Sequence, residues 1–349
     1  MRVAIDATPL TLSSGGLRRY VEELSVALAE SFPEDEFCLV SDQPFRMPHT
    51  TPFNLRRGGG PRHPAERRWW LWGLEREMQR LDAGLFHGTD FAVPYVPRRP
   101  SVLTLHDLSP WMDRAWHSDA DRVRQRTPLL IGLGLATMIV TPSEAVRKQA
   151  IERFRIHPDR IRAVPLAAST CFRPAKASPG PPYFLYAGTL EPRKNVLGLL
   201  AAWREVRRLH AVDLVLAGRR RSDFAQLSPE PGLQIIGEVS DARLAELFAG
   251  TLAFVYPSFY EGFGLPVLEA MQCGACVIAS RDPAITEVAA GAALQAGSLA
   301  ELVRAMLDLA MHPEWAAPWR ERALRRASEF SWRRTAQLTH EVYESALGR

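Results

Sequence analysis

The chain has 349 residues, of which 46% are hydrophobic and 23% are charged, and its formal net charge is +4. This composition is typical of a globular protein and excludes a disordered, collagen-like or coiled-coil chain. The length predicts about two domains. The longest strongly apolar run, Leu129–Val140, is shorter than the roughly 18 residues of a membrane-spanning helix. Asp6 falls where a signal peptide needs its apolar core, so we expect a cytoplasmic protein.

Short apolar runs alternate with longer helical patterns, which is typical of parallel sheets with crossover helices. In the first half we expect strands at Val3–Ile5, Phe37–Val40, Leu85–His87, Val102–Leu105 and Met138–Thr141. In the second half we expect strands at Tyr183–Tyr186, Asp213–Ala217, Leu233–Ile236, Ala253–Tyr256 and Cys276–Ala279. Helical patterns include Arg18–Ala29, Asn195–Leu209, Asp241–Phe248 and Pro266–Gln272. The sequence therefore predicts two doubly wound α/β domains.

The best candidate for a linker is Phe172–Pro182, which is rich in proline. The interiors of helices and strands do not tolerate proline. We therefore expect an N-terminal domain at residues 1–172, a linker at 173–182 and a C-terminal domain at 183–328. Two such domains would leave a cleft between the carboxyl ends of their sheets, where doubly wound folds bind ligands. The net charge is +5 over residues 1–176 and −1 over residues 177–349.

A first candidate site follows the expected strand at Tyr183–Tyr186. Gly188 provides a turn, and Arg193 and Lys194 then stand at the start of a helical pattern. Two cations beside the free N–H groups of a helix start would suit a diphosphate. The same two residues could instead be a solvated pair in a loop. Lysine is rare in this chain, which favours the site slightly.

A second candidate follows the expected strand at Ala253–Tyr256. Glu261 is expected in a glycine-containing loop and Glu269 in the helix after it. The backbone N–H groups of Phe263, Gly264 and Leu265 could bind hydroxyls or phosphate, and the carboxylates could accept hydrogen bonds from sugar and ribose hydroxyls. The carboxylates could also be no more than helix caps.

Together these segments resemble the family-four, or group 1, retaining glycosyltransferases of the GT-B fold. Their E-x7-E motif matches Glu261 and Glu269, and the resemblance also covers Ser14–Tyr20, Leu105–Leu108, Thr141–Glu144, Ile235–Asp241 and Ile285–Val288. It implies two Rossmann-like domains facing each other across a cleft. It also implies that residues 329–349, which have helical apolar spacing, cross back to the N-terminal domain. Within this family, the chain is similar to the bacterial mannosyltransferases of surface-polysaccharide assembly.

The resemblance assigns roles by position. Arg193 and Lys194 would neutralise the diphosphate of the donor, Glu261 would hold a sugar hydroxyl and Glu269 the nucleotide ribose. Phe263, Gly264 and Leu265 would contact the donor through their N–H groups. Roles in the N-terminal domain fall to Gly16, which would allow close approach to the diphosphate, to His106 near the reacting sugar, and on the acceptor side to Arg18 and Asp107. Arg18 stands where many members have glycine.

The implied reaction moves a hexose, with mannose favoured, from a nucleotide sugar to a saccharide or lipid-linked acceptor. GDP-mannose is favoured over UDP- or dTDP-sugars, and no metal cofactor is expected. Retention of configuration implies a front-face mechanism in which the leaving phosphate oxygen helps to deprotonate the acceptor, so no dedicated base is needed. Two alternatives stay open: a GT-B nucleotide-sugar epimerase or hydrolase, and a non-catalytic nucleotide-sugar-binding subunit of a synthase complex.

Three weaker motifs favour other functions. Asp119-Ala120-Asp121 matches a metal-binding D-x-D, but it lies in a polar stretch typical of a helix start. Gly132-x-Gly134 is half of a dinucleotide fingerprint, and it precedes a strand instead of following one. Arginines are mostly interleaved with acids, which argues against nucleic acid as a partner. The pair Cys273-x-x-Cys276 lacks a second pair or a histidine, so metal use is not expected there.

The stretch Arg62–Leu81 allows two interpretations. Its tryptophans and arginines could form an amphipathic helix at an anionic membrane surface, at the inner face of the plasma membrane. It could equally be a helix packed on its own domain with solvated arginines, and its three glutamates dilute the charge. The membrane hypothesis predicts that Trp69→Ser with Trp70→Ser abolishes liposome binding.

Overall fold

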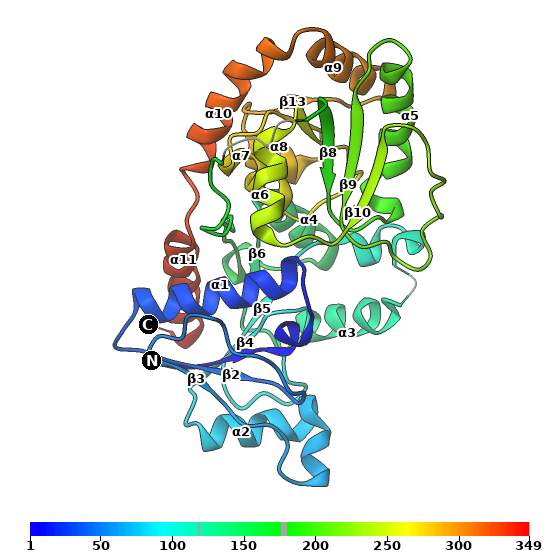
Figure 1. Cartoon of the computed structure of the whole chain (residues 1–349). Helices are drawn as coiled ribbons and strands as arrows, with labels where there is room; N and C mark the ends of the chain where they lie inside the picture. The colour runs from blue at the N-terminus through cyan, green and yellow to red at the C-terminus, as the bar shows by residue number, and fades with distance from the viewer. Residues whose placement is uncertain (118, 176–179, 349) are drawn as a thin grey trace. The chain divides into compact units, whose positions relative to one another are not determined.

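The computed structural model describes residues 1–117, 119–175 and 180–348, and the chain divides into two compact units (Figure 1). The first unit is Met1–Leu166 together with the segment from Ser331, and the second is Ala167–Phe330. The division precedes the expected linker, four residues of which, 176–179, lie outside the described residues. The division falls six residues before the expected boundary at residue 172, and Phe172 is fully buried in the second unit, with its ring 6.1 Å from that of Phe248.

The first unit is built on a seven-stranded parallel sheet in the order β3-β2-β1-β4-β5-β6-β7. Its strands are β1 (Arg2–Asp6), β2 (Glu36–Val40), β3 (Leu55–Arg57), β4 (Leu85–Gly88), β5 (Ser101–Thr104), β6 (Met138–Thr141) and β7 (Ile161–Ala163). Its helices are α1 (Gly16–Ser31), α2 (Leu74–Arg80), α3 (Asp121–Gly132), α4 (Glu144–Phe154) and α11 (Trp332–Leu347). The central strands are buried except at Arg2, as expected when crossover helices cover both faces of a sheet.

The second unit repeats this plan with a six-stranded parallel sheet in the order β10-β9-β8-β11-β12-β13. Its strands are β8 (Tyr183–Ala187), β9 (Asp213–Ala217), β10 (Leu233–Gly237), β11 (Ala253–Tyr256), β12 (Val277–Ala279) and β13 (Leu294–Gln295). Its helices are α5 (Val196–Arg207), α6 (Asp241–Gly250), α7 (Leu265–Gln272), α8 (Pro283–Ala289), α9 (Leu299–Met311) and α10 (Ala317–Ala327). In both units the strand order reverses beside the first strand, which is where doubly wound sheets bind ligands.

Serine residues begin four of the helices. The side-chain hydroxyl of each accepts a hydrogen bond from the backbone N–H three residues on, which satisfies one of the free donors of a helix start. These caps are Ser143, Ser240, Ser298 and Ser331. Substitution of such a cap by alanine typically costs about 1 kcal/mol of stability, so these serines help to fix where the crossover helices begin.

The C-terminal helix α11 packs on the first unit beside α1 (Figure 1). The hydroxyl of Tyr343 lies 2.7 Å from Nδ1 of His87 in the buried interior, and His340 Nε2 lies 2.7 Å from a carboxylate oxygen of Asp35. Thr335 donates to the carbonyl of Pro165 at 2.7 Å. The final residues of the chain thus complete the core of a unit that begins at Met1.

The stretch Arg62–Leu81 is not one continuous helix. It forms a 3-10 turn at Pro64–Arg67, a π-helical turn at Trp69–Gly73 and then α2. The backbone of Arg68 lies outside the helical region, at φ −76° and ψ 64°, and interrupts the helix. Trp69 is only 2% exposed, so the expectation that it contacts a membrane is wrong: its ring belongs to the core of the first unit.

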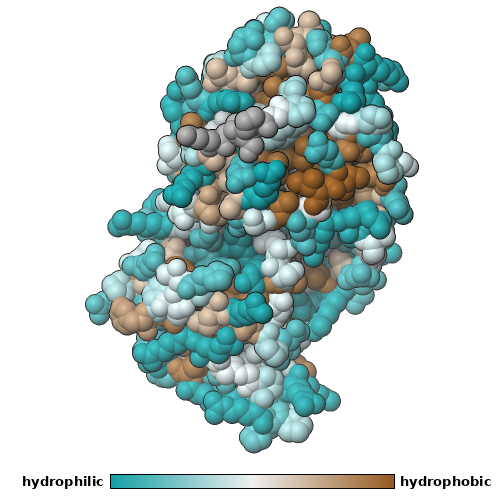
Figure 2. All heavy atoms as spheres, in the orientation of Figure 1, coloured by the Kyte–Doolittle hydropathy of each residue, from teal (hydrophilic) through white to brown (hydrophobic). Residues whose placement is uncertain are grey.

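Strand β10 forms an edge of the second sheet and is largely uncovered. Residues 218–232, all of them described, connect it to the parallel neighbour β9 without the helix that such crossovers usually contain. Ile235 and Ile236 are therefore exposed. Figure 2 shows apolar side chains gathered over the region of β9 and β10.

Candidate functional site

The site begins at the carboxyl end of β8, where Gly188 turns the chain at φ 146°. A Cβ on Gly218, at the end of β9, would lie 2.1 Å from the carbonyl oxygen of Gly188, so the two loops touch backbone to backbone. A 3-10 turn at Pro192–Lys194 then carries Arg193 and Lys194 into the interior, where each is less than a tenth exposed. The two cations are therefore not a solvated surface pair.

Glu261 lies between these cations. Its Oε1 accepts a hydrogen bond from Lys194 Nζ at 2.6 Å, and its Oε2 accepts one from Arg193 Nη1 at 3.3 Å. The hydroxyl of Ser258 also donates to Oε1, and the hydroxyl of Tyr256 accepts from Lys194 Nζ at 2.8 Å. Since β8 and β11 are paired parallel neighbours, the loops after them meet at one edge of the sheet.

A second carboxylate, Glu191, extends the network. Its Oε1 accepts from Arg193 Nη2 at 2.9 Å, and its Oε2 lies 3.3 Å from Arg221 Nη1. Arg221 in turn pairs with Asp223 through Nε and Nη2. With Lys194 and Glu261 included, three cations face three carboxylates, so this network is balanced before any ligand binds.

The electrostatics of the central pair follow from its burial. Burial would raise the pKa of the Glu261 carboxyl, but Lys194 and Arg193 outweigh this effect and lower the pKa to about 2. Burial, followed by the neighbouring charge of Arg193, lowers the pKa of Lys194. The Glu261 carboxylate is thus ionised at neutral pH. A further anion beside Lys194 would favour the charged form of the Lys194 amine.

Helix α7 begins at the same edge of the sheet. Gly264 precedes it at φ 91°, a conformation that favours glycine, and a Cβ there would lie 3.3 Å from Ile285. The N–H groups at a helix start have no partner within the helix. The predicted donors at residues 263–265 lie at this start or directly before it. Glu269 lies within α7 and is buried.

Asp282 is a further residue of this edge that sequence reasoning missed. Its Oδ2 accepts from the backbone N–H of Glu261 at 3.3 Å, while Oδ1 caps α8 by accepting from the N–H groups of Ala284 and Ile285. Burial raises the pKa of Asp282 to about 6. The dipeptide Asp-Pro at a helix start signals the cap, but no local pattern signals the contact with the loop of Glu261.

The other expected residues belong to the first unit. Gly16 is the first residue of α1 and is exposed, and a Cβ there would meet nothing within 4 Å. His106 Nε2 lies 2.6 Å from the carbonyl oxygen of Thr89, and its ring meets that of Tyr20 edge to face at 5.0 Å. His106 is thus held in one orientation at the carboxyl end of the first sheet.

The two residues expected on the acceptor side have local partners. Arg18 Nη1 donates to the carbonyls of Leu10 and Leu12 at 2.9 and 2.8 Å. Asp107 Oδ1 accepts from both the backbone N–H and the hydroxyl of Ser109. These contacts stabilise the loops of the first unit. They use part of the hydrogen-bonding groups of each side chain, so fewer of these groups are available to a ligand.

No three His, Cys, Asp or Glu side chains gather as a metal site within the described parts of the chain. Asp121 of the D-x-D sequence instead pairs with Arg124 at 2.8 Å. Nor does any described helix have the length and apolar character to cross a bilayer.

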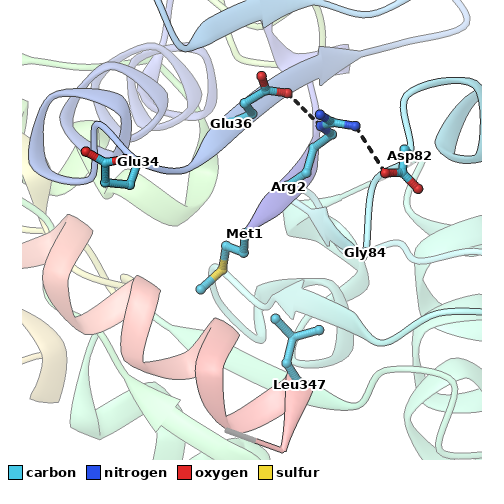
Figure 3. Close-up of a pocket in the computed structure, with 7 residues that line it drawn as sticks. All are labelled: Met1, Arg2, Glu34, Glu36, Asp82, Gly84 and Leu347. Atoms are coloured by element: carbon cyan, nitrogen blue, oxygen red, sulfur yellow. Dashed lines mark hydrogen bonds and ion pairs between the residues drawn. The ribbon is translucent and has the colours of Figure 1, made fainter.

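A cavity of about 440 Å³ lies at the opposite, amino-terminal end of β1 (Figure 3). Its Arg2 is paired with Glu36 at 2.6 Å and with Asp82 at 3.3 Å. Because three carboxylates, those of Glu34, Glu36 and Asp82, line this cavity beside a single arginine side chain, it is a poor site for a diphosphate. The residues that the sequence predicts for function lie elsewhere.

Comparison with known proteins identifies the class. Two family models match consecutive parts of the chain: "Glycosyltransferase Family 4" over residues 14–172 and "Glycosyl transferases group 1" over residues 170–325. The chain is 33% identical to the O-antigen chain mannosyltransferase B of Escherichia coli over 307 residues, which are 81% of this chain and 78% of that protein. The chain therefore belongs to the group 1 glycosyltransferases and is a glycosyltransferase.

Solved structures agree on the fold. Sucrose-phosphate synthase from Thermosynechococcus elongatus matches with a TM-score of 0.80 over 99% of both chains at 18% identity. Anabaena HepE in complex with UDP-glucose matches with a TM-score of 0.73 over 99% of this chain and 100% of that one, at 17% identity. The expected GT-B fold of two Rossmann-like domains is confirmed.

Proposed function

We propose that this glycosyltransferase transfers a hexose, with mannose favoured, from a nucleotide diphosphate sugar to a saccharide or lipid-linked glycan in cell-surface polysaccharide biosynthesis. The observation that carries the proposal is the buried pair Arg193 and Lys194 beside Glu261. Mannose and the polysaccharide are supported by the similarity to the O-antigen mannosyltransferase. GDP-mannose is the favoured donor over UDP- and dTDP-sugars. Because two cations would supply the charge that a diphosphate needs, we expect no metal cofactor.

Donor binding would exchange partners within the network. A diphosphate entering beside Lys194 and Arg193 competes with Glu261 for both cations. The diphosphate as a whole carries more negative charge than one carboxylate, and charge-assisted hydrogen bonds to its oxygens are strong. Glu261, displaced from the cations, would then accept hydrogen bonds from hydroxyls of the donor sugar. The N–H groups at the start of α7 would bind beside it, and Glu269 would hold the ribose.

The transfer step needs few further groups. The acceptor hydroxyl oxygen forms a bond to the anomeric carbon as the bond from that carbon to the phosphate oxygen breaks. The leaving phosphate oxygen takes the proton of the acceptor, so the configuration is retained and no separate base is required. Arg193 and Lys194 would stabilise the negative charge that grows on the leaving group. Gly16 and His106 stay predicted contributions of the first unit to donor binding.

A binding screen tests the donor. The full chain is mixed with GDP-, UDP- and dTDP-sugars and its thermal unfolding is measured. A ligand that binds only the folded protein stabilises it by about 2.7 kcal/mol at a hundredfold excess over Kd. We expect the largest rise in Tm with GDP-mannose, a loss of the rise in Lys194→Ala, and no loss in Lys148→Ala, since Lys148 is an exposed lysine of α4.

Product analysis separates the alternatives. Radiolabelled sugar recovered on a glycan acceptor, with retained anomeric configuration by NMR, supports the proposal. Free or epimerised sugar formed without an acceptor indicates the hydrolase or epimerase. Donor binding without turnover in the presence of a competent acceptor indicates a non-catalytic subunit, and no binding of any nucleotide sugar contradicts the assigned site.

A further inference from the structure

The positive charge of the first half is concentrated in one part of the first unit. Residues 43–81 contain eight arginines and three glutamates, an excess of five. This excess equals the whole net charge of residues 1–176, so the rest of that half is balanced. Figure 2 draws this end of the unit, around α2, mostly in the hydrophilic colour.

The three glutamates of this part are buried. Glu66 contacts Arg80 and accepts from the backbone N–H of Arg62 at 2.8 Å. Glu77 accepts from the N–H of Gly59 at 2.6 Å. Glu75 accepts from the backbone N–H of Arg98 at 3.0 Å and pairs with the guanidinium of Arg99 at 3.2 Å. These carboxylates therefore hold the loops together from the inside, and they pair with Arg76, Arg80 and Arg99. The arginines outside these pairs carry the positive charge of the surface.

Two apolar side chains point outward from the same segment. The π-helical turn buries Trp69 but leaves Leu71 36% exposed and Trp72 49% exposed. Gly73 makes this turn possible, because a Cβ there would lie 2.1 Å from the carbonyl oxygen of Glu66. Leu71 and Trp72 lie three to five residues after Arg67 and Arg68. These two arginines are exposed and have no ion-pair partner among the described residues.

A neighbouring loop widens this surface. The backbone N–H of Tyr95 donates to the carbonyl of Trp70 at 2.9 Å, which holds the loop against the π-helical turn. Val96 in this loop is 47% exposed, and Arg98 is exposed as well. We define the tryptophan–arginine surface as Arg67, Arg68, Leu71, Trp72, Val96 and Arg98. It combines exposed apolar tips with arginines, and no carboxylate is among its members.

We propose that the tryptophan–arginine surface binds a membrane that contains anionic lipids. Tryptophan with its polar N–H partitions into the headgroup region, and arginines beside it pair with lipid phosphates. Each basic residue near an anionic leaflet contributes about 1 kcal/mol, or about fivefold in binding. An acidic protein partner could also contact the arginines. The projecting Leu71, Trp72 and Val96 favour a membrane, because its apolar acyl chains lie below its charged headgroups.

Vesicle sedimentation of the full-length protein tests this inference. The probes are vesicles of phosphatidylcholine with 30% phosphatidylglycerol, and vesicles of phosphatidylcholine alone, at low and at physiological salt. We expect binding to the anionic vesicles that falls with salt, and weak binding to the neutral ones. Leu71→Ser with Trp72→Ser should lower the partition coefficient about tenfold, and Arg67→Gln with Arg68→Gln should lower it by at least as much.

The matched control is Trp315→Ser, which removes a tryptophan of similar exposure, 51%, from the second unit and should not change binding. Unchanged Tm values show that the variants fold. The inference is overturned if the protein does not bind anionic vesicles at low salt, if it binds neutral vesicles equally well, or if the double variants bind like the unaltered protein. A protein partner would leave the vesicles unbound and so falls under the first of these outcomes.

Discussion

Both units bury carboxylates against cations, but the cations are buried in the second unit and exposed in the first. In the second unit the cations Arg193 and Lys194 are themselves buried with Glu261. In the first unit Glu66 is buried, whereas the side chain of its partner Arg76 is 55% exposed. A buried cation can be reached only by a ligand that enters and replaces its carboxylate. An exposed cation above a buried carboxylate presents charge to whatever lies outside the molecule.

The difference would let one fold serve both of the negative partners proposed above. The buried network is balanced, so we expect it to discriminate among anions. An anion that enters must contact both fixed cations, because its new ion pairs have to offset those that it breaks. The tryptophan–arginine surface places no such demand on geometry and suits a fluid array of phosphates. The predictions below test the two regions in order of expected effect.

Loss of a buried cation should have the largest effect. We expect Lys194→Ala to lower kcat by about 100-fold to 1000-fold, because one charged donor to the leaving phosphate is lost. Glu261→Ala should have an effect of similar size through the sugar contact. Steady-state transfer assays measure both. Near-normal turnover by both variants would refute the assigned site, and Lys148→Ala serves as the control.

Loss of a buried carboxylate in the first unit should affect stability instead. Glu77→Ala leaves the N–H of Gly59 and Nη1 of Arg80 without their acceptor, which costs roughly 1–3 kcal/mol. Thermal unfolding should show a fall in Tm of several degrees. The exposed neighbour Arg76→Ala should stay within about 0.5 kcal/mol of the unaltered protein. Equal effects of the two changes would contradict the contrast between buried acid and exposed base.

The pH dependence of stability should report the ion pairs of Glu261. Its pKa is lowered to about 2 in the folded protein, below that of an ordinary glutamate. The stability that ionised Glu261 contributes is therefore complete above about pH 5 and is lost as the pH falls toward 2. The difference in unfolding free energy between the unaltered protein and Glu261→Gln should narrow over that range. If this difference in unfolding free energy does not change with pH, Glu261 does not have the lowered pKa expected from its ion pairs.

A single hydroxyl at the edge of the buried network should have the smallest effect. Tyr256→Phe removes the oxygen that accepts from Lys194 at 2.8 Å. We expect kcat/KM to fall about fivefold, in line with roughly 1 kcal/mol for one hydrogen bond. Tyr183→Phe removes a hydroxyl that donates to the carbonyl of Leu247 and should leave kcat/KM unchanged. A loss above 100-fold in Tyr256→Phe would require a direct role of the hydroxyl in the reaction.

Much of the fold could be predicted because the central strands are short, continuous apolar runs. Val3–Ile5 and Asp213–Ala217, for example, match β1 and β9 within a residue. The edge strands β3 and β7 escaped prediction. Their sequences, Leu-Arg-Arg and Ile-Arg-Ala, show only a single buried residue each because solvent replaces neighbours there.

The site could be predicted only as far as it is local in sequence. Arg193 and Lys194 are adjacent, and Glu261 lies in a recognisable loop. Arg221 joins the network only because the loops after β8 and β9 touch. No sequence pattern in either loop predicts this contact. In the same way the tryptophans and arginines of Arg62–Leu81 allow a surface role, but which ring faces outward depends on a π-helical turn that periodicity does not reveal.

The return of α11 to the first unit sets an order of assembly during synthesis. A ribosome completes every residue of the second unit before it reaches Trp332. The first unit until then lacks the helix that supplies Tyr343 and His340 to its interior. Domains usually fold as units in the order in which they emerge. Here the part of the chain that is made first must wait, so α1 and the strands beside it depend longest on protection from aggregation.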